Sequence, residues 1–480
     1  MRRVAGLVLL GAVVAVAACN ALTGASDLST AACPECGPAG SSGSSGTGSS
    51  GSGGEGGFDA RWDAPKPPPN AALDGTFGQG GVVLSNLLDT VTSVALRSDG
   101  RIVVAGASAG QLAVVQLAAN GAIDPGFGSG GRVIAGTMTS SRADAVSVDS
   151  AGRILAGGVA TTTSQNGAVV QVAYVVRIAN GGLDPTFASM GRKVFTSDGE
   201  AITAIAAESA FGGYVVGGRA PSALSGTVGA LWQLTSAGAF LDAMSPRVDV
   251  SYAAGSSSTI TAMIGGGAAP LLVAGSVAAA PLGGATTDFA AARLTTAGYD
   301  TSFSGDGKIV LPVGASADSA FAVARFADDS YLVGGDVDVA AQGLMNRSPL
   351  LGLVRVASDG GPVKDWGNGG KVVTAFALPG DLTPGRGDHL RGVAVDSTGR
   401  VIAVGYVEET KSKSRRHVAV LRLGQNATSD VFFGTFGLIT DFFDPASTDS
   451  AASAVVLQPD GKMVVVGTAT GQLAVARINP

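Results

Sequence analysis

A repeated pattern constrains this chain more than any other feature. Residues 123–178 give it in full: a glycine-rich Asp-x-x-Phe turn, a short apolar strand, an alternating strand, a tight turn, a third strand and a fourth strand ending near an arginine. A spacing of about 50 to 65 residues between copies is too long for β-helix rungs and fits four strands per unit, as in propeller blades. The turn aromatic recurs at Phe77, Phe127, Phe187, Phe303, Trp366 and Phe433, with a degenerate copy around Phe240-Leu241-Asp242.

The tight turns between alternating apolar segments count the same units independently. Asp-Gly and Gly-Gly pairs accept the positive φ angles that two-residue hairpins need. The seven turns are Asp99-Gly100, Ala151-Gly152, Gly212-Gly213, Gly266-Gly267, Asp329-Ser330, Thr398-Gly399 and Asp460-Gly461. The predicted fold is therefore all-β: a seven-bladed β-propeller of about four antiparallel strands per blade over residues 71–480. The low fraction of charged residues, 14%, suits many short strands better than long charged helices.

The first and last repeats are complementary. The first begins at its turn and short strand, and the last ends just after its fourth strand. We therefore expect Val82-Val83-Leu84 to complete the C-terminal blade and close the ring, because closure removes exposed sheet edges.

Glycines and polar residues recur at fixed places in the strands. We expect the glycine at the end of each third strand to permit a bulge or the close approach of a neighbouring backbone. These glycines are Gly106, Gly157, Gly217, Gly275, Gly334, Gly405 and Gly467. A polar residue in an apolar strand needs a partner, and each fourth strand carries one: Gln116, Arg177, Gln233, Arg293, Arg355, Arg422 and Arg477.

The turn aspartates are the obvious partners for these polar residues. They are Asp74, Asp124, Asp184, Asp242, Asp300 and Asp430, whereas the sixth unit has Val363 at this position with Asp365 nearby. We interpret the two sets as structural pairs. A binding role for the ring of arginines is the alternative, although ligand sites are rarely sevenfold.

The array resembles the delta-60 repeat family, whose units look like blades of a bacterial β-propeller of unknown function. The residues that carry the resemblance are Leu183-Asp184-Pro185-Thr186-Phe187, Gln458-Pro459-Asp460-Gly461-Lys462 and Ala474-Val475-Ala476-Arg477-Ile478. It extends over residues 73–480, and the fourth unit departs from it by lacking the Phe-Gly turn. The resemblance implies a fold and no activity.

The N-terminal residues indicate export and lipidation. Arg2 and Arg3 precede an apolar run of the length typical of a signal peptide, so residues 1–18 are predicted to be removed. The sequence Val16-Ala17-Ala18-Cys19 resembles the bacterial lipobox, which implies lipidation of Cys19 and attachment to a membrane; an ordinary secretory signal is the alternative. Because Asn20 is not the aspartate that often marks inner-membrane retention, the outer membrane of a bacterial cell envelope is favoured.

Residues 19–70 form the predicted linker. Cys33 and Cys36 are an even pair in an exported chain, so we expect a short-range disulfide. Residues 37–57 are almost entirely glycine and serine, which predicts a disordered tether with a root-mean-square reach of roughly 25 Å.

The expected topology places function on one face. In an up-and-down meander the regular turns share one end of the propeller, and the variable loops share the other. The variable loops include residues 161–167, 219–227, 278–287, 338–349, 374–390 and 407–416. Long variable loops on a rigid scaffold are where binding usually resides.

The sequence shows no catalytic constellation. His389 and His417 each fall in a predicted long loop, and we expect neither a cofactor nor a metal, with calcium at aspartate-containing turns such as Ser304-Gly305-Asp306-Gly307 as the open alternative. The one basic cluster, Lys411, Lys413, Arg415 and Arg416, reads as a solvated loop or as a contact for an acidic ligand such as anionic polysaccharide or lipid headgroups. A net charge of −6 gives no basic footprint for nucleic acid.

We therefore predict an envelope-anchored lipoprotein whose propeller is a binding or scaffolding module, without enzymatic activity, for an unidentified protein or polysaccharide. The alternatives are a propeller enzyme acting on polysaccharide, as a lyase or hydrolase, and a purely structural surface-layer role.

Overall fold

The computed structural model divides the chain into two units, residues 1–57 and 58–480. It describes residues 72–480 apart from 165, 208–212, 243–246, 266–268, 279–285, 315–316, 339–348, 378–385, 410–414 and 448. Cys19, Cys33, Cys36, the tether at 37–57, Lys411 and Lys413 lie outside the described residues. Within the described part, no helix is long and apolar enough to cross a membrane.

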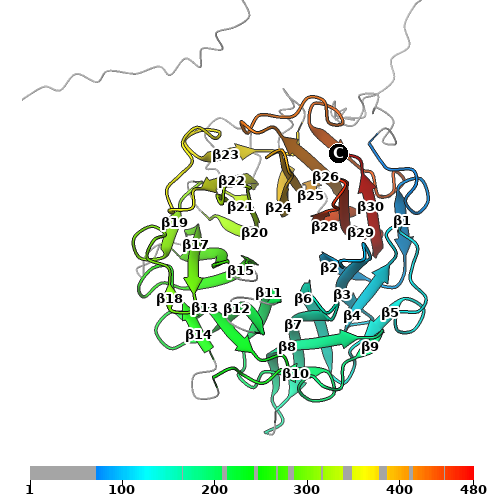
Figure 1. Cartoon of the computed structure of the whole chain (residues 1–480), viewed down its shortest axis with the longest axis vertical. Helices are drawn as coiled ribbons and strands as arrows, with labels where there is room; N and C mark the ends of the chain where they lie inside the picture. The colour runs from blue at the N-terminus through cyan, green and yellow to red at the C-terminus, as the bar shows by residue number, and fades with distance from the viewer. Residues whose placement is uncertain are drawn as a thin grey trace, which may run out of the picture. The chain divides into compact units, whose positions relative to one another are not determined.

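The described residues form seven antiparallel sheets arranged around an axis (Figure 1), which confirms the predicted seven-bladed propeller. Blade 1 consists of β2 (Thr90–Leu96), β3 (Ile102–Ser108), β4 (Gln111–Leu117) and β5 (Arg132–Ile134). Blade 2 consists of β6 (Ser140–Val148), β7 (Ile154–Thr163), β8 (Val169–Ala179), the short β9 (Gly182–Leu183) and β10 (Arg192–Val194). Blade 3 consists of β11 (Ala201–Ala207), β12 (Tyr214–Ser222), β13 (Gly226–Leu234) and β14 (Arg247–Val250).

The other blades repeat this order. Blade 4 consists of β15 (Ser258–Ile264), β16 (Leu271–Ala278), β17 (Thr287–Thr295), the short β18 (Gly298–Tyr299) and β19 (Lys308–Leu311). Blade 5 consists of β20 (Ser319–Arg325), β21 (Tyr331–Val337), β22 (Leu350–Val356) and β23 (Lys371–Thr374). Blade 6 consists of β24 (Arg386–Val395), β25 (Val401–Glu409), β26 (Arg416–Leu423) and β27 (Leu438–Thr440). Blade 7 consists of β28 (Ser450–Leu457), β29 (Met463–Ala469), β30 (Gln472–Ile478) and β1 (Val82–Ser85).

The ring closes as the sequence predicted. The first strand, β1, pairs antiparallel with the last, β30, with Val82 opposite Ala476 and Leu84 opposite Ala474. Backbone hydrogen bonds from Asp74 N to Arg477 O (2.8 Å) and from Asn479 N to Ala72 O (2.8 Å) extend the seam. Closure leaves the N-terminal and C-terminal repeats sharing one blade.

The hydrophobic cores lie between blades. Alternation along each strand gives a sheet two apolar faces, and each face packs on the next blade. One core joins blades 7 and 1 through Phe77, Val104 and Val475, and another joins blades 2 and 3 through Phe187, Tyr214 and Trp232. The turn aromatics therefore fill the interfaces rather than the interior of their own sheets.

Each inner strand carries a β-bulge, and a glycine opposite it makes room. In blade 4 the register shifts between Ile260 and Ala262, and a Cβ on Gly275 would lie 1.8 Å from the carbonyl oxygen of Thr259. The equivalent glycines in the seven blades are Gly106, Gly158, Gly218, Gly275, Gly335, Gly405 and Gly467. The sequence placed three of these glycines one residue too early, at Gly157, Gly217 and Gly334. In these strands two glycines are adjacent, so the sequence does not show which of them lies opposite the bulge.

The connections separate onto two ends of the propeller. We call the end with the hairpin turns and the aromatic turns the turn face; its fully described hairpin turns occupy residues 97–101, 149–153, 326–330, 396–400 and 458–462. The opposite end, the loop face, holds connections of uneven length, of which the fully described ones include residues 109–110, 135–139, 195–200, 223–225, 251–257 and 470–471. The irregular connections therefore share the end where each inner strand begins.

Both histidines lie on strands, so their prediction in long loops was wrong. His389 is in β24 and His417 is in β26. The reason is that the β25 hairpin arms extend further than their sequence pattern indicates: Asp388 pairs with Val407, and Glu408 pairs with Arg416.

Candidate functional site

The arginines of the fourth strands form latches between blades on the turn face. Arg177, only 1% exposed, lies with Nε 2.8 Å from Asp184 Oδ2 and donates through Nη2 to Thr186 Oγ1 at 2.9 Å. Its Nη1 donates to the carbonyl oxygen of Ser236 in the next blade, and the guanidinium lies 4.8 Å from the centre of the Phe187 ring. Nε and Nη2 thus fix the aromatic turn of blade 2, and Nη1 joins that turn to blade 3 through Ser236 and the Tyr214 hydroxyl.

The same arrangement recurs around the ring. The guanidinium Nε lies 2.8 Å from the turn carboxylate in Arg293–Asp300 and Arg477–Asp74, and 2.9 Å from it in Arg422–Asp430. In blade 1 the shorter Gln116 donates to Asp124 Oδ2 at 2.8 Å. These turn aspartates are therefore occupied by hydrogen bonds and ion pairs that stabilise the propeller.

Arg355 has a different partner from the one its position suggests. With Val363 at the turn position, its Nη2 bonds Asp328 Oδ2 at 2.8 Å and its guanidinium lies 3.8 Å from the centre of the Phe326 ring. Asp328 and Phe326 belong to the hairpin turn of the same blade. This pair therefore fixes one blade internally, and Asp365 plays no part in it.

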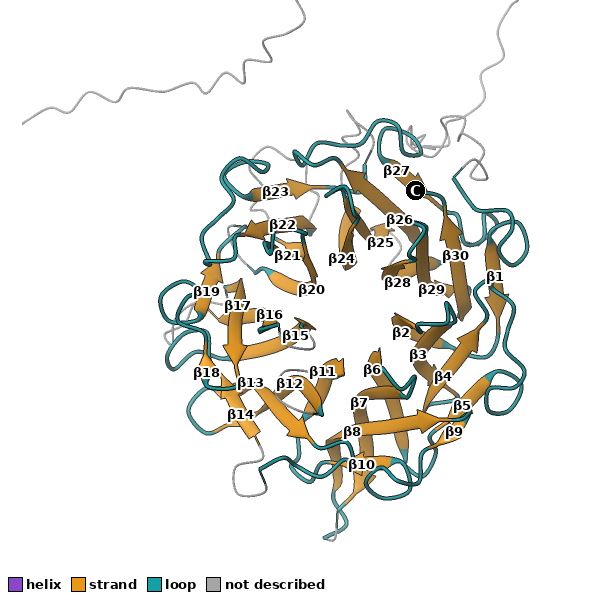
Figure 2. Ribbon diagram, viewed as in Figure 1, coloured by secondary structure: helices purple, strands orange, loops and turns teal. Residues whose placement is uncertain are grey.

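The bulge residues of the inner strands distinguish ordinary blades from exceptional ones. In four blades the residue is Ser or Thr, and its hydroxyl donates to a carbonyl of the next inner strand, as Thr203 Oγ1 does to Ile260 O at 2.5 Å and Thr261 Oγ1 to Ala320 O at 2.7 Å. The other three bulges carry Asp144, Phe321 and Arg391. These three depart from a stabilising pattern, in the inner strands bordering the axis (Figure 2).

Two of the exceptions meet at the loop face in a cluster of charged and aromatic side chains. We call Asp336, His389, Arg391, Tyr406 and Glu408, together with Phe321, the blade 5–6 cluster. His389 Nδ1 lies 2.8 Å from Asp336 Oδ2, and its Nε2 lies 3.3 Å from Glu408 Oε2. The imidazole stacks on Tyr406 with ring centres 4.8 Å apart.

Arg391 is the centre of this cluster. Its Nη1 donates to Asp336 Oδ2 at 3.2 Å, and its Nη2 donates to the Tyr406 hydroxyl at 3.2 Å. The guanidinium lies 4.6 Å from the centre of the Phe321 ring. The Arg391 side chain is 28% exposed and the Glu408 side chain is 27% exposed. Solvent therefore reaches a guanidinium and a carboxylate beside aromatic rings at one place on the surface.

Further charged pairs extend the cluster into blade 7. Arg416 forms a bidentate pair with Asp449 at 2.6 and 2.9 Å, and this hydrogen bonding raises the pKa of the guanidinium. His417 Nδ1 lies 2.9 Å from Asp441 Oδ1. Arg415 is more loosely placed, 3.9 Å from Glu409. Of the four basic residues predicted to contact an acidic ligand, Arg416 is thus paired with Asp449, whereas the Arg415 side chain is largely exposed to solvent.

A second polar hollow surrounds the third exceptional bulge. A cavity of about 270 Å³ is lined by Arg142, Asp144, Gln171, Thr203 and Arg219, among others. Burial raises the pKa of Asp144, although Arg142 at 2.7 Å opposes that rise. A half-buried carboxylate flanked by two arginines can hold a ligand group through charge and hydrogen bonds together.

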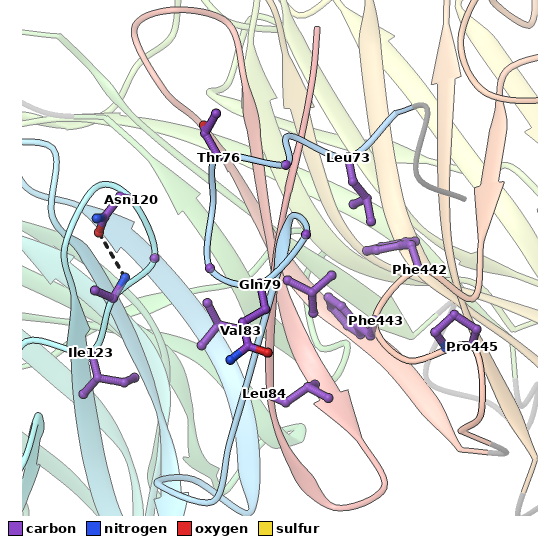
Figure 3. A pocket seen from close by; sticks show the side chains of 16 residues that line it. Leu73, Thr76, Gln79, Val83, Leu84, Asn120, Ile123, Phe442, Phe443 and Pro445 are labelled. Carbon is purple, nitrogen blue, oxygen red and sulfur yellow. Dashed lines mark hydrogen bonds between the residues drawn. The ribbon is translucent and has the colours of Figure 1, made fainter. Parts of the chain in front are cut away.

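A larger groove, of about 830 Å³, follows the closure seam on the rim (Figure 3). Leu73, Leu84, Phe442 and Phe443 supply its apolar walls. Two of its polar side chains are engaged locally: Thr76 Oγ1 donates to Asp74 Oδ1 at 2.7 Å, and Asn120 Oδ1 accepts a hydrogen bond from Ala122 N. The groove is therefore better explained by packing at the seam than by ligand recognition.

Among the described residues, no group of three or more His, Cys, Asp or Glu side chains is arranged to hold a metal ion. In the turn at 304–307, Asp306 Oδ1 accepts a hydrogen bond from Lys308 N at 3.0 Å. Calcium binding at such turns stays a hypothesis.

Sequence reasoning did not find the blade 5–6 cluster. Its members come from β20, β21, β24 and β25, and the register of two hairpins on neighbouring blades brings them together. One signal was present in the sequence: the residue that is Ser or Thr in most inner strands is Asp144, Phe321 or Arg391 in the others.

The fold and its repeated latches define the chain as a seven-bladed β-propeller. A family model described as "Domain of unknown function (DUF5122) beta-propeller" matches residues 97–127 and 458–480, in blades 1 and 7. These matches support a β-propeller repeat family.

Comparison with curated proteins gives no match. Among solved structures, virginiamycin B lyase from Staphylococcus aureus is similar over 83% of this chain and 98% of its own, with 9% identity and a TM-score of 0.42. A gluconolactonase from Xanthomonas campestris is similar over 83% of this chain and 90% of its own, with 11% identity and a TM-score of 0.33. At these values the likenesses say nothing about the activity of this chain.

Proposed function

We propose that this protein is an envelope-anchored binding module whose loop face holds an acidic polysaccharide. The observation that carries the proposal is the blade 5–6 cluster, in which Arg391 and Glu408 remain partly exposed beside the rings of Phe321 and Tyr406. A rigid closed ring supports the cluster, and binding residues are commonly found on irregular connections carried by such a scaffold.

The chemistry of the cluster favours a uronic-acid sugar over a neutral one. Carboxylates such as Glu408 accept hydrogen bonds from sugar hydroxyls, and aromatic rings pack on the apolar face of a sugar. Arg391 can pair with a uronate carboxylate through charge-assisted hydrogen bonds, which are stronger than neutral ones. Arg415, with Lys411 and Lys413 nearby in the sequence, adds positive charge on the same blade.

Arg391 also indicates a role beyond folding. At its position four other blades have a hydroxyl that bonds the neighbouring inner strand, and this blade lacks that bond. Proteins depart from such stabilising patterns chiefly at functional sites.

The second candidate is a polysaccharide lyase or hydrolase. It is favoured by the placement of His389 between Asp336 and Glu408 and against Tyr406, since a histidine held by carboxylates can transfer protons. Incubation with polygalacturonate distinguishes the two candidates: an enzyme produces unsaturated or reducing ends that increase with time, and a binding module does not.

The binding test uses affinity electrophoresis of the full chain carrying Cys19→Ser, in gels containing polygalacturonate or, for comparison, neutral dextran. We expect polygalacturonate to retard the protein and Arg391→Thr to weaken binding about tenfold, the effect of losing one charge-assisted hydrogen bond. Threonine restores the hydroxyl of the ordinary blades, so the variant should fold. Arg325→Thr is the matched control, since its exposed pair with Asp329 lies on the turn face. Equal retardation of all three proteins, or none, rules out the proposed site.

The anchor is part of the proposal. Supporting it are the lipobox-like sequence before Cys19 and the apolar run that precedes it. Metabolic labelling with a fatty-acid analogue should label the wild-type chain and not Cys19→Ser. Membrane fractionation then decides between outer and inner membrane. Mass spectrometry of free thiols tests the disulfide proposed between Cys33 and Cys36.

A further inference from the structure

The aromatic turn of blade 6 exposes apolar side chains to an unusual degree. Phe432 is 94% exposed, Phe436 is 56% exposed and Val431 is 55% exposed. We call these three residues the aromatic tip. They lie in one short segment of the turn face, between β26 and β27.

Phe432 replaces a residue that stabilises the latch elsewhere. The equivalent residues are Thr76, Thr186 and Ser302, whose hydroxyls accept a hydrogen bond from the latch arginine and donate one to the turn aspartate. A phenylalanine can do neither. A separate difference is that Nη1 of the blade 6 arginine, Arg422, has no hydrogen-bond partner within the described part of the chain, whereas in the other three latches Nη1 donates to a carbonyl of the next blade.

Phe436 adds backbone strain. Its φ is +53°, whereas the same position is glycine in three other turns, with φ of +64° at Gly80 and +62° at both Gly130 and Gly369. A non-glycine residue in this region is disfavoured by its Cβ. The turn therefore gives up stability at two positions and exposes two aromatic rings in return.

We propose that the aromatic tip inserts into the surface of a lipid bilayer. The place where the chain enters the propeller supports this occupant: Ala72 and Leu73 begin the turn of the adjacent blade, on the same face, and Leu73 shares a hydrophobic core with Phe433. The inference rests on the proposed anchoring, since the residues before Ala72 lead back to the predicted lipid on Cys19. A tethered propeller has this face available to the membrane.

The size and charge of the tip also favour a bilayer over a protein partner. A stable protein interface buries about 800 Å² on each side, which three side chains on one turn do not supply. The neighbouring side chains are hydroxyl-bearing or already paired: Asp430 bonds Arg422, and Arg400 bonds Asp396. Exposed aromatic residues without free charge suit the headgroup region, where they anchor peripheral proteins. With the turn face on the membrane, the loop face points away and stays open to its ligand.

The test is co-sedimentation of the full chain carrying Cys19→Ser with vesicles of phosphatidylethanolamine and phosphatidylglycerol. Because this protein has no acyl chain, failure of the anchor proposal does not affect the result. We expect the vesicle-bound fraction to fall about tenfold in Phe432→Thr/Phe436→Gly. That variant restores the latch hydroxyl and relieves the positive φ, so its urea midpoint should equal or exceed that of the parent.

Met190→Gly is the matched control. Met190 occupies the Phe436 position in blade 2, with φ of +53° and 68% exposure, and its replacement should leave vesicle binding unchanged. The proposal is overturned if the parent does not sediment with vesicles, if the double variant binds as well as the parent, or if the parent forms a dimer that the double variant does not, which would identify a second copy as the occupant.

Discussion

Replacing Arg177 with methionine tests the latch between blades 2 and 3. Methionine keeps the apolar stem and removes the guanidinium, so Asp184, which is 7% exposed, loses the cation at 2.8 Å. Breaking a buried ion pair from one side typically costs about 3 to 5 kcal/mol. Because Asp184 keeps its hydrogen bonds from Thr186, we expect the lower end of that range, about 3 kcal/mol.

The assay is urea unfolding followed by tryptophan fluorescence; the chain has three tryptophans, and the one at this interface is Trp232. This side chain is 2% exposed and lies in the core that joins blades 2 and 3, so it reports on the interface that the substitution weakens. Urea is preferred to guanidinium because salt screens ion pairs. The matched control is Arg325→Met, whose pair with Asp329 is largely exposed and should cost at most about 1 kcal/mol.

A double variant identifies the origin of the loss. Arg177→Met/Asp184→Asn removes the unpaired charge, so it should recover at least about 1 kcal/mol relative to Arg177→Met alone. Equal effects of Arg177→Met and Arg325→Met, within about 0.5 kcal/mol, would contradict a stabilising role for the buried pair. A double variant less stable than Arg177→Met alone would contradict it as well.

Three further predictions concern the turns, the bulges and the candidate site. Hydrogen bonding from the Ser302 hydroxyl holds the pKa of Asp300 below its usual range. This carboxylate therefore contributes stability above about pH 4 that is lost as the pH falls through its folded pKa. Ser302→Ala should make the urea midpoint less dependent on pH between neutral and acid conditions. Gly275→Ala should destabilise the fold severely, since its Cβ would meet a carbonyl oxygen at 1.8 Å, whereas Gly182→Ala, with nothing within 4 Å, should change the midpoint little. Asp144→Thr should raise the midpoint at neutral pH, because burial raises the pKa of this carboxyl and threonine restores the hydroxyl of the ordinary bulges; an unchanged or lower midpoint contradicts that reasoning.

The fold could be predicted from the sequence because its signals are local and repeated. Each unit carries its own hairpin turn and turn aromatic, and seven copies average out the irregular ones. Ring closure followed from where the pattern begins and ends, and residues 82–85 do pair with the last strand.

Register limited the finer predictions. Adjacent glycines such as Gly157 and Gly158 look alike in sequence, and only the pairing of Gly158 with Ala143 beside the bulge separates them. Arg355 shows the same limit, since Asp328 reaches it from another turn while Asp365 is closer along the chain.

The candidate site was hidden for a related reason. Asp336, His389 and Glu408 belong to different strands, and their meeting depends on hairpins that extend to the loop face. The departures at Arg391 and Phe432 were visible in the sequence as breaks in a repeated pattern. Comparing the repeats position by position is therefore the most informative way to find function in such a chain.

Hydrogen exchange measured by mass spectrometry, with and without polygalacturonate, tests the central claim most directly. We predict that the polysaccharide slows exchange in peptides covering β24 and the end of β25, which carry His389, Arg391 and Glu408. Arg391→Thr should need about tenfold more polysaccharide for the same protection. Protection confined to the turn face, such as residues 424–437, or no protection under saturating polysaccharide, would contradict it.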